Sequence, residues 1–382
     1  MTLVAKDSGY LFMVSQDKTY KKIIRTGPRA SFLFVCLFVV FLSGCGEQKP
    51  KELVFSGMTM GTSYQVKLVL GNGASGNGVL TENLSEQIDS RLESLNQTFS
   101  TYIETSELMQ FNQAQIAQPQ AVSEDMQFVM SIAQEIYDLT DGAFDPTVAP
   151  LVNLWGFGPK ESGDIIPKPK QIHHALSMIG LNNLVLNKVA REAQRERNIK
   201  LDFSAIAKGY AVDVVADLLE SSGIEHYLVE VGGELRASGH KQNGDLWRIA
   251  IEKPSSDQSL NQVSLEQSPL KQIAQQVISL QDAAVATSGD YRNYFEKNGK
   301  RYSHTIDPRT GYPVDHKLVS VTVIEKTAIR ADALATAMMV MGPKNSLMLA
   351  EEYNIPVYIL IKEADGFKVQ YSKAFAHYLS GD

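Results

Sequence analysis

Two oxygen-bearing side chains one helical turn apart give the clearest chemical signal in the sequence. Asp332 and Thr336 stand at positions i and i+4 of a segment that is otherwise mostly small or apolar, so on a helix they share one face. A carboxylate and a hydroxyl on a packed helix are hard-oxygen ligands of the kind that Mg²⁺ prefers. A purely structural interpretation remains open, with Asp332 favouring a helix amino terminus and Thr336 bonding back to a carbonyl.

The run from Asp202 to Tyr210 is a second candidate. We expect Asp202 to end a strand and the next helix to open with N–H groups that favour a phosphate. Lys208, about one turn inside that helix, could carry an ammonium to a diphosphate. Gly209 in mid-helix costs up to ~1 kcal/mol against Ala, which suggests that something approaches its backbone closely. The alternative is a solvated lysine beside a packing glycine.

Two further segments allow a ligand contact without requiring one. Asp141 and Asp145 flank Phe144 in a stretch with Asp-Gly and Asp-Pro pairs, which are turn formers, so a plain loop is the default. Phe144 could instead line a pocket for a planar ring. Gly232 and Gly233 follow a predicted strand, where they would form a turn or let a ligand touch the backbone.

His304 is the one histidine of seven that stands in a dense polar cluster. A histidine in a polar turn is more often structural than catalytic. As a functional residue it could accept the proton of an attacking hydroxyl, a role that contributes typically ~10²–10⁴-fold in rate.

The elements that would position these side chains alternate irregularly, which is typical of the α+β class rather than of a regular βαβ repeat. Periodicity and end signals predict helices from Thr81 onward and over 124–139, 169–179, 204–220 and 329–341, with Ser123 as an N-cap and Gly342 as a stop. Strands are expected within 53–70 and at 227–231, 246–252, 277–280, 319–324 and 357–361. The stretch 254–275, rich in Ser and Gln, is expected to be an exposed insertion.

Residues 1–44 are interpreted as an export leader. A basic stretch precedes the apolar run 31–42, which is short for a membrane span and typical of a signal-peptide core. Leu42-Ser43-Gly44-Cys45 then resembles a bacterial lipobox. We expect cleavage before Cys45, lipid on its thiol and amine, a polar tether over 45–52, and a location on the periplasmic side of a bacterial membrane, inner or outer. An anchor helix with an incidental cysteine is the alternative.

Composition excludes several classes of protein. The 382 residues are 44% hydrophobic and 21% charged with a net charge of −7, enough for one large domain or two lobes and without the basic balance of a nucleic-acid binder. Of two cysteines only Cys45 would survive cleavage, which excludes a disulfide framework and thiolate metal sites. The motifs of P-loop nucleotide hydrolases, zinc proteases and α/β-hydrolases are absent.

The order of the motifs resembles the ApbE family of FAD:protein FMN transferases, from about residue 53 to the carboxyl terminus. The matching blocks are Met58-Thr59-Met60-Gly61-Thr62, Phe99-Ser100-Thr101-Tyr102, Ser106-Glu107-Leu108, Asp141-Gly142-Ala143-Phe144-Asp145-Pro146, the run from Asp202 to Tyr210, Gly232-Gly233-Glu234, Thr287-Ser288-Gly289-Asp290-Tyr291, Ser303-His304-Thr305-Ile306-Asp307-Pro308 and Ala331-Asp332-Ala333-Leu334-Ala335-Thr336-Ala337. Several blocks in one order make the resemblance specific.

The resemblance implies an α+β, two-lobed fold over 53–382, with mixed β-sheets and flanking helices around a central flavin cleft. FAD would be bound by Met60, Tyr102, Ala143, Phe144, Asp145, Asp202, Lys208 and Ile306. Mg²⁺ would be held by the Ala205 carbonyl, Asp332 and Thr336, with the Ala335 backbone nearby. His304, Asp202 and Lys208 would be the catalytic residues, the first two as proton acceptors and the lysine as a cation beside the diphosphate.

By the same resemblance, the chain would transfer FMN from FAD to a Thr or Ser hydroxyl of an exported protein and release AMP. Exported domains of membrane redox complexes, such as sodium-pumping NADH:quinone reductase, would be the acceptors. Three alternatives stay open. With water as acceptor the same site would be an FAD pyrophosphatase, a non-catalytic lipoprotein would bind FAD without consuming it, and a structural lipoprotein would bind no flavin.

Overall fold

The computed structural model describes residues 51–70, 78–158, 166–252, 274–289, 294–297, 300–364 and 366–379. The leader, Cys45 and nearly all of the predicted insertion 254–275 lie outside these ranges. Contacts group Lys49–Asp382 into one unit. The first strand begins at Lys51, so the last two residues of the predicted tether are already part of the fold.

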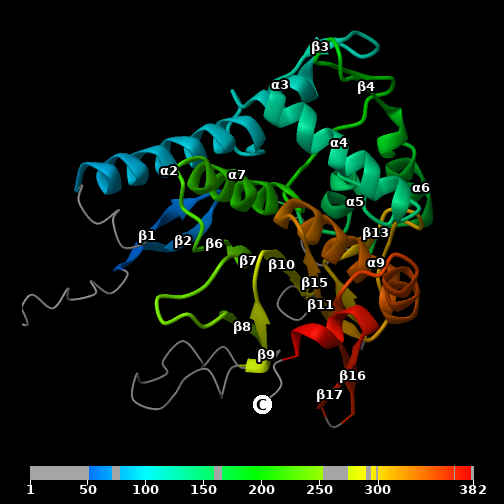
Figure 1. Ribbon diagram of the computed structural model, residues 1–382. Helices are drawn as coiled ribbons and strands as arrows, with labels where there is room; N and C mark the ends of the chain where they lie inside the picture. The colour runs from blue at the N-terminus through cyan, green and yellow to red at the C-terminus, as the bar shows by residue number, and fades with distance from the viewer. Residues whose placement is uncertain are drawn as a thin grey trace, which may run out of the picture. The chain divides into compact units, whose positions relative to one another are not determined.

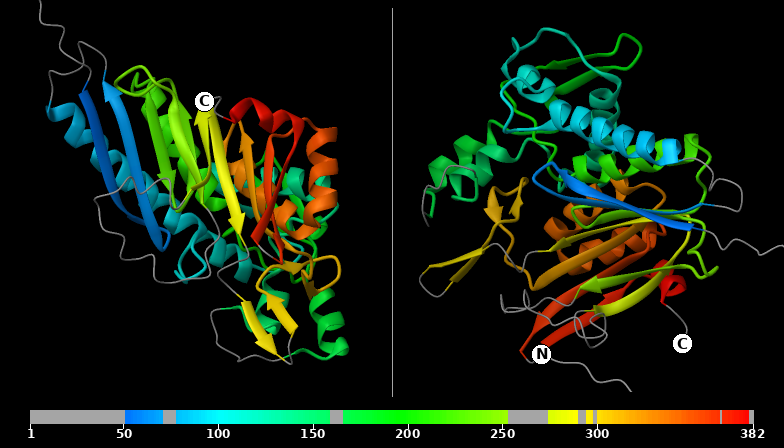
Figure 2. Two further views of the ribbon diagram at one scale, coloured as in Figure 1. Left: turned by 90° about the horizontal axis from the view of Figure 1, so that it is seen from below. Right: turned by 90° about the vertical axis from the view of Figure 1, so that its left-hand side faces the viewer.

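An eight-stranded sheet forms the centre of this unit. Its spatial order is β1 (Lys51–Thr59), β2 (Thr62–Leu70), β6 (Tyr227–Val231), β7 (Glu234–Ser238), β10 (Ala283–Gly289), β15 (Leu318–Glu325), β16 (Val357–Glu363) and β17 (Gly366–Tyr371). Figure 2 shows the sheet from blue β1 at one edge to red β17 at the other. Every strand pair among the described residues is antiparallel. The α+β class is confirmed, while the mixed pairing expected from the sequence is not found in this part of the chain.

Helices cover one face of the sheet. They are α2 (Gly78–Phe99), α3 (Glu107–Gln113), α4 (Glu124–Leu139), α7 (Ala207–Ser221) and α9 (Ala328–Glu352), with the short α5 (Ala149–Leu154) and α6 (Pro169–Leu176) nearby. In Figure 1, α7 and α9 lie next to the sheet. The main hydrophobic core fills the space between these helices and the strands.

The opposite face carries a smaller hydrophobic cluster. Its cover consists of a hairpin, β8 (Trp247–Glu252) with β9 (Ala274–Leu280), and of the 3₁₀ helix η3 (Lys373–Tyr378). The remaining elements are β3 (Gln120–Ala121), β4 (Leu184–Asn187), β5 (Glu192–Arg195), β11 (Tyr294–Lys297), β12 (Lys300–Ser303), β13 (Ile306–Asp307), β14 (Tyr312–Pro313) and η1 (Leu181–Asn183). Among the described residues, no helix combines the length and apolarity needed to cross a bilayer.

Helix α4 illustrates how local sequence determines these elements. Ser123 at its N-cap accepts a hydrogen bond from the Met126 N–H at 3.1 Å, as predicted, and satisfies one of the unpaired donors of the first turn. Val129, Ala133 and Ile136 are buried in the main core because their spacing puts them on one face of the helix.

The start of α7 differs from the prediction. Asp202 does not end a strand, because its N–H donates to the Pro146 carbonyl and its carboxylate accepts from Ser204, which folds the chain into a turn. The helix therefore begins only at Ala207, and Lys208 and Gly209 lie in its first turn rather than deeper inside.

The predicted stop in α9 is confirmed. Gly342 has a non-helical backbone with φ 78° and ψ 172°, and a positive φ is a conformation that glycine adopts without steric cost. Pro343 follows directly, and a second helical segment continues to Glu352, since proline is well tolerated in a first turn. This second segment was not expected from the sequence.

Candidate functional site

A buried cluster of one lysine and two acids joins three elements. Lys208 near the start of α7 lies with its Nζ 2.8 Å from Glu234 Oε1, at the start of β7, and 3.8 Å from Asp332 Oδ2 in α9. The two acid side chains are only 7% and 5% exposed. The structure thus brings together two residues that the sequence predicted, Lys208 and Asp332, and adds one that it did not.

The cluster holds two acids for one base, and its charges shift the pKa values of Lys208 and Glu234. Burial lowers the pKa of Lys208, but the Asp332 and Glu234 carboxylates outweigh that effect and raise it above its ordinary value. Burial and the Asp332 carboxylate raise the pKa of Glu234 to about 8, against the lowering effect of Lys208. Glu234 Oε2 is buried and has no hydrogen-bond partner. A buried carboxyl oxygen without a partner, beside a second acid, favours the binding of a proton or of a further cation.

Neutral oxygen atoms lie on the same helices. Thr336, one turn beyond Asp332, has its Oγ1 3.2 Å from Ser288 Oγ at the end of β10. Gly209 donates its N–H to Asp332 Oδ2 at 3.1 Å, and among the described residues no backbone N–H donates to the Ala205 carbonyl. Ala335 is fully buried, so only its backbone could take part.

The oxygen atoms of Asp332, Thr336 and Ala205 are of the types that bind a magnesium ion. Among the described residues there is no group of three or more His, Cys, Asp and Glu side chains suited to a metal. Mg²⁺ does not need one, because it is commonly held by one or two carboxylates together with waters and substrate phosphates. A carboxylate, a hydroxyl and an available carbonyl are ligands of the types that Mg²⁺ binds.

The Gly232 turn lies against both the start of β2 and the lysine stem. A Cβ added to Gly232, which has φ +60°, would lie 2.8 Å from Thr62 Cγ2 and 3.0 Å from Lys208 Cδ. Met60 occupies the hairpin turn between β1 and β2 with φ 48° and packs partly against the main core. The paired glycine is therefore a turn that also admits the lysine stem, and it lies against Thr62 at the start of β2.

The segment around Asp145 is held mainly by its own hydrogen bonds. Asp145 Oδ1 accepts from the Thr147 N–H at 2.8 Å and from the Thr147 hydroxyl at 2.6 Å, and burial raises the pKa of this carboxyl. Phe144 and Ala143 are 2% and 1% exposed, and Phe144 packs in the main core. Their side chains do not line an open pocket, so a ligand would meet the backbone of this segment.

A pocket of about 620 Å³ borders this segment. Asp141, Asp145, Asn182 and Arg309 are among its polar lining residues. Its volume lies in the range of small-molecule sites. The Asp202 N–H is bonded to the Pro146 carbonyl at 2.7 Å, which connects this segment to the turn before α7.

A larger hollow of about 990 Å³ lies between α2, α4 and α7. It contains none of the predicted site residues. Asp125 in this hollow accepts from both Arg91 and Tyr210, so these three polar side chains are paired with one another. We interpret it as a junction between packed helices rather than as the site.

Two predicted residues lie in separate loops. Tyr102 is 82% exposed, in a turn after α2 that the Ser100 hydroxyl holds by accepting from the Tyr102 and Ile103 N–H groups. The ring of His304, between β12 and β13, lies edge-on to Phe157 at 6.4 Å between centroids. The hydrogen bonds and ion pairs of the described residues do not join Tyr102 to the lysine cluster.

Ile306 is buried rather than open to a ligand. Its side chain is 4% exposed and packs in a small cluster with Trp155 and Ile172. Strand β13, to which it belongs, contacts α9. Any contribution of Ile306 to binding would therefore come from its backbone.

Sequence reasoning did not select Glu234 and Ser288 as site residues. Each stood within a matching block, Glu234 directly after the paired glycines and Ser288 between Thr287 and Gly289. The available signal for Glu234 was an acid at the start of a strand. Nothing local marked Ser288, because its partner lies on a different element.

Comparison with known proteins places the whole described unit in one family. The model of the ApbE family matches residues 60–359. The chain is 43% identical over 353 residues to a Vibrio cholerae FAD:protein FMN transferase, covering 92% of this chain and 99% of that protein. It is 38% identical over 362 residues to an Escherichia coli K12 FAD:protein FMN transferase, covering 92% and 97% of the two chains.

Solved structures agree with this result. The fold is similar to the flavin transferase ApbE from Vibrio cholerae, with a TM-score of 0.75 and 41% identity over 86% of this chain and 100% of that one. It is also similar to the apo form of the Pseudomonas stutzeri flavinyl transferase ApbE, with a TM-score of 0.76 and 39% identity over 87% and 98% of the chains. The chain therefore belongs to the ApbE family of FAD:protein FMN transferases.

Proposed function

We propose that the protein transfers FMN from FAD to a Thr or Ser hydroxyl of an exported partner protein, with Mg²⁺ as cofactor and AMP as the second product. Transfer of FMN from FAD to a protein is the activity of its family. The observation that supports the metal and the diphosphate is the buried cluster of Lys208, Glu234 and Asp332. It holds a fixed cation for a phosphate and two carboxyl groups, one of which is left for a metal.

The chemistry is a phosphoryl transfer. The acceptor hydroxyl oxygen bonds to the FMN-side phosphorus, the bond from that phosphorus to the bridging oxygen breaks, and AMP leaves with the electron pair. Such reactions depend mainly on positioning and on neutralising the phosphoryl oxygens. Lys208 supplies one positive charge from the first turn of α7. The hydroxyl proton would pass to His304, or to Asp202 through a water molecule.

Magnesium would be held by Asp332, Thr336 and the Ala205 carbonyl. When bound, it would supply positive charge to the diphosphate oxygens. Its affinity would depend on the Asp332 carboxylate and on the Lys208 ammonium 3.8 Å from it.

Lipidation at Cys45 would hold the enzyme on the periplasmic side of the membrane. The support for this location is the leader, lipobox and tether in the sequence. Strand β1 begins at Lys51, so only five residues separate the lipidated cysteine from the first strand. Exported domains of membrane redox complexes, such as sodium-pumping NADH:quinone reductase, are the acceptors that such a tether would favour.

To test this proposal, the protein is incubated with FAD, Mg²⁺ and an exported acceptor domain. Flavin bound to the acceptor is then measured by in-gel fluorescence, and the release of AMP is followed in parallel. We expect a fluorescent acceptor band that EDTA or Asp332→Ala abolishes. Asp245→Ala, in an exposed turn after β7, is the control acid, and an acceptor without its Thr is the control substrate. AMP without a labelled band would favour the FAD pyrophosphatase, and neither product would favour a flavin carrier.

A further inference from the structure

The two helices that carry the site do not cap themselves. The N-cap position of α7 is Ile206, and α9 begins after Thr327, whose side chain makes no capping bond. Thr327 Oγ1 is buried and has no hydrogen-bond partner. The first N–H groups of a helix have no partner within it, so both helices must find acceptors elsewhere.

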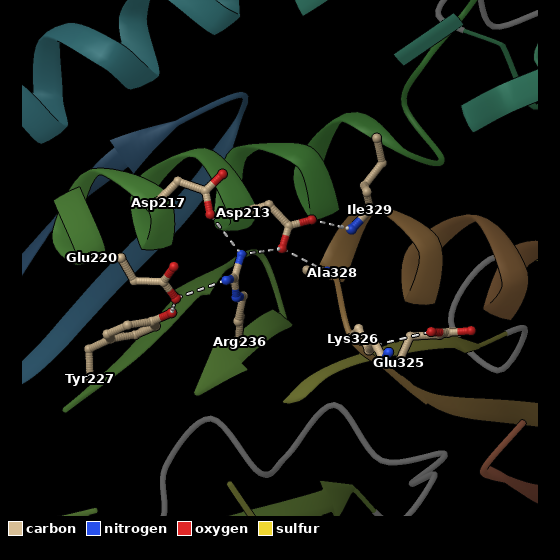
Figure 3. Close-up of polar contacts among 9 residues, drawn as sticks. All are labelled: Asp213, Asp217, Glu220, Tyr227, Arg236, Glu325, Lys326, Ala328 and Ile329. Carbon is tan, nitrogen blue, oxygen red and sulfur yellow. Dashed lines mark hydrogen bonds and ion pairs between the residues drawn. The ribbon is translucent and has the colours of Figure 1, made fainter. Parts of the chain in front are cut away.

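Each helix receives its acceptor from the other. Asp332 of α9 accepts the Gly209 N–H of α7 at 3.1 Å. Asp213 of α7 accepts the Ala328 N–H at 2.9 Å and the Ile329 N–H at 2.8 Å, the first two of α9. Figure 3 shows the Asp213 carboxylate between its two backbone donors. The two acids lie about one turn from the donors on their own helices, so one crossing point is fixed from both sides.

The backbones are in contact at this crossing. A Cβ added to Gly209 would lie 2.3 Å from the Ala328 carbonyl oxygen and 2.8 Å from the Ile329 Cα. The glycine that the sequence marked as a place of close approach therefore admits α9 rather than a ligand. Any shift of α9 along α7 would break the reciprocal bonds.

Asp213 is itself held in place by Arg236 of β7. One nitrogen of this guanidinium, Nη1, lies 3.3 Å from Asp213 Oδ1 and 3.0 Å from Asp217 Oδ1, and Nη2 lies 2.9 Å from Glu220 Oε1. Figure 3 shows Arg236 reaching from its strand to the three acids of α7. Of these three, only Asp213 bonds to α9.

We propose that Asp213 is a positioning residue for the metal and diphosphate site. By fixing the first turn of α9 against α7, it sets Asp332 at the distance from Lys208 that the site requires. This inference rests on the proposed function, since it assumes that Asp332 binds a divalent cation. Asp213 acts through Ala328 and Ile329 and touches none of the reacting groups.

A positioning role for Asp213 can be distinguished from a purely stabilising role by asking whether the cap of α9 comes from its own chain segment or from α7. A side chain at Thr327 could cap α9 locally and would stabilise the helix just as well. A cap from Asp213 does something more, because it also ties α9 to the helix that carries Lys208. A local cap added to a variant without Asp213 would therefore restore the stability of the helix but not the geometry of the site.

The first experiment measures Mn²⁺ binding by electron paramagnetic resonance, with Mg²⁺ as competitor, on the full-length protein in detergent. We expect Asp213→Asn to weaken Mn²⁺ binding about tenfold, the lower end of the usual effect for a group that orients a metal ligand. Asp217→Asn is the matched control, because it removes the same charge from the same Arg236 without touching α9. We expect it to bind Mn²⁺ within about twofold of the wild type.

The second experiment adds a local cap and compares Mn²⁺ affinity with thermal stability. In Asp213→Asn/Thr327→Asp we expect the melting temperature to recover while Mn²⁺ affinity stays low. This double variant also serves if Asp213→Asn alone does not fold. Recovery of both properties together, or unchanged Mn²⁺ binding in Asp213→Asn, would overturn the inference. A wild type that binds no Mn²⁺ would overturn the metal site itself, and this inference with it.

Discussion

A hydroxyl that binds a metal through an oxygen lone pair must point its hydrogen atom away from the ion. Thr336 can meet this need through Ser288, whose Oγ lies 3.2 Å from the Thr336 hydroxyl. If Ser288 accepts a hydrogen bond from the Thr336 hydroxyl, a lone pair of Thr336 is left for the ion. Groups that orient a ligand in this way usually contribute about 10–100-fold in metal affinity.

We therefore expect Ser288→Ala to weaken Mn²⁺ binding about tenfold while the protein stays folded. The same strand offers a matched control, since Thr287 Oγ1 pairs with Thr322 Oγ1 at 2.9 Å. Thr287→Val removes a comparable hydroxyl pair from the neighbouring position and should leave Mn²⁺ binding unchanged. Equal losses in both variants, measured by the same resonance titration, would count against a role for Ser288 in the metal site.

Asp213 should make stability depend on pH in a definite direction. Burial raises its pKa from 3.8 to about 6 and outweighs the bonds from Ile329 and Ala328 and the charge of Arg236. Because the folded chain holds this proton more tightly than the unfolded chain, the stability from the group is fully present below its ordinary pKa. It is lost as the pH rises through about 6.

Urea unfolding of wild type and Asp213→Asn at several pH values tests this dependence. We expect the difference in unfolding free energy to move in favour of the variant between about pH 4 and pH 6. Above about pH 7 it should stay constant. The same urea measurements on Asp217→Asn show how the unfolding free energy changes when a different acid beside Arg236 is removed. A difference that does not change with pH would contradict the prediction.

The residue types of the site could be predicted from sequence to different degrees. Asp332 and Thr336 could be selected because their spacing on one helix is a local property. Glu234 and Asp213 could not, because their roles depend on partners far along the chain: Glu234 meets Lys208, and Asp213 meets Ala328. A plain loop was the default expectation around Phe144, and the Phe144 side chain lies in the core, so it does not line the ring pocket that was the alternative.

At the scale of elements, the crossing of α7 and α9 depends on the absence of a side chain at Gly209. An added methyl group would meet the Ala328 carbonyl oxygen at 2.3 Å, and the contact is with backbone, which cannot rotate away. We expect Gly209→Ala to destabilise the fold by about 1–3 kcal/mol, the usual cost of overpacking. Because α9 must move, Mn²⁺ binding should weaken as well.

Thermal unfolding and Mn²⁺ titration of the same preparation test this prediction. Ser221→Ala, at the exposed carboxyl end of α7, is the control and should change stability by no more than about 0.5 kcal/mol. The ordinary helix propensity of Ala would by itself favour Gly209→Ala. A more stable variant would therefore show that the crossing is not as tight as the structure indicates.

Elements were easiest to predict where their ends are set by local chemistry. Ser123 marks the start of α4 and Gly342 the stop in α9, and both are borne out. The start of α7 was misplaced because Asp202 bonds to the distant Pro146 carbonyl instead of continuing a strand. An end that depends on such a tertiary bond leaves no periodic signal in the sequence.

At the scale of the whole molecule, the site is built where the helical layer meets the sheet. Helix α7 brings Lys208, strand β7 brings Glu234 and helix α9 brings Asp332. The α+β class followed from the irregular order of elements, but the antiparallel order of all eight strands did not. Strand neighbours such as β7 and β10 are far apart along the chain, and periodicity carries no information about such pairing.

The last prediction concerns the attachment of this unit to a membrane. If Cys45 carries lipid, Cys45→Ser should abolish labelling with radioactive palmitate and move the protein out of the carbonate-washed membrane fraction. Transfer of FMN to an acceptor domain in detergent should be unchanged, because the lysine cluster lies in the unit that begins at Lys49. In cells, transfer of FMN to a membrane-bound acceptor should fall, because the enzyme and the acceptor are no longer held on the same membrane at a high effective concentration.

Cys36→Ser is the matched control, because it changes the only other cysteine and lies within the expected leader. It should leave palmitate labelling, membrane attachment and cellular flavin transfer as in the wild type. A Cys45→Ser protein that still resists carbonate extraction would point to the apolar run 31–42 as an uncleaved anchor. In that case the chain would leave the membrane before residue 45. The tether would then be longer than the one proposed and would favour membrane-bound acceptors less strongly.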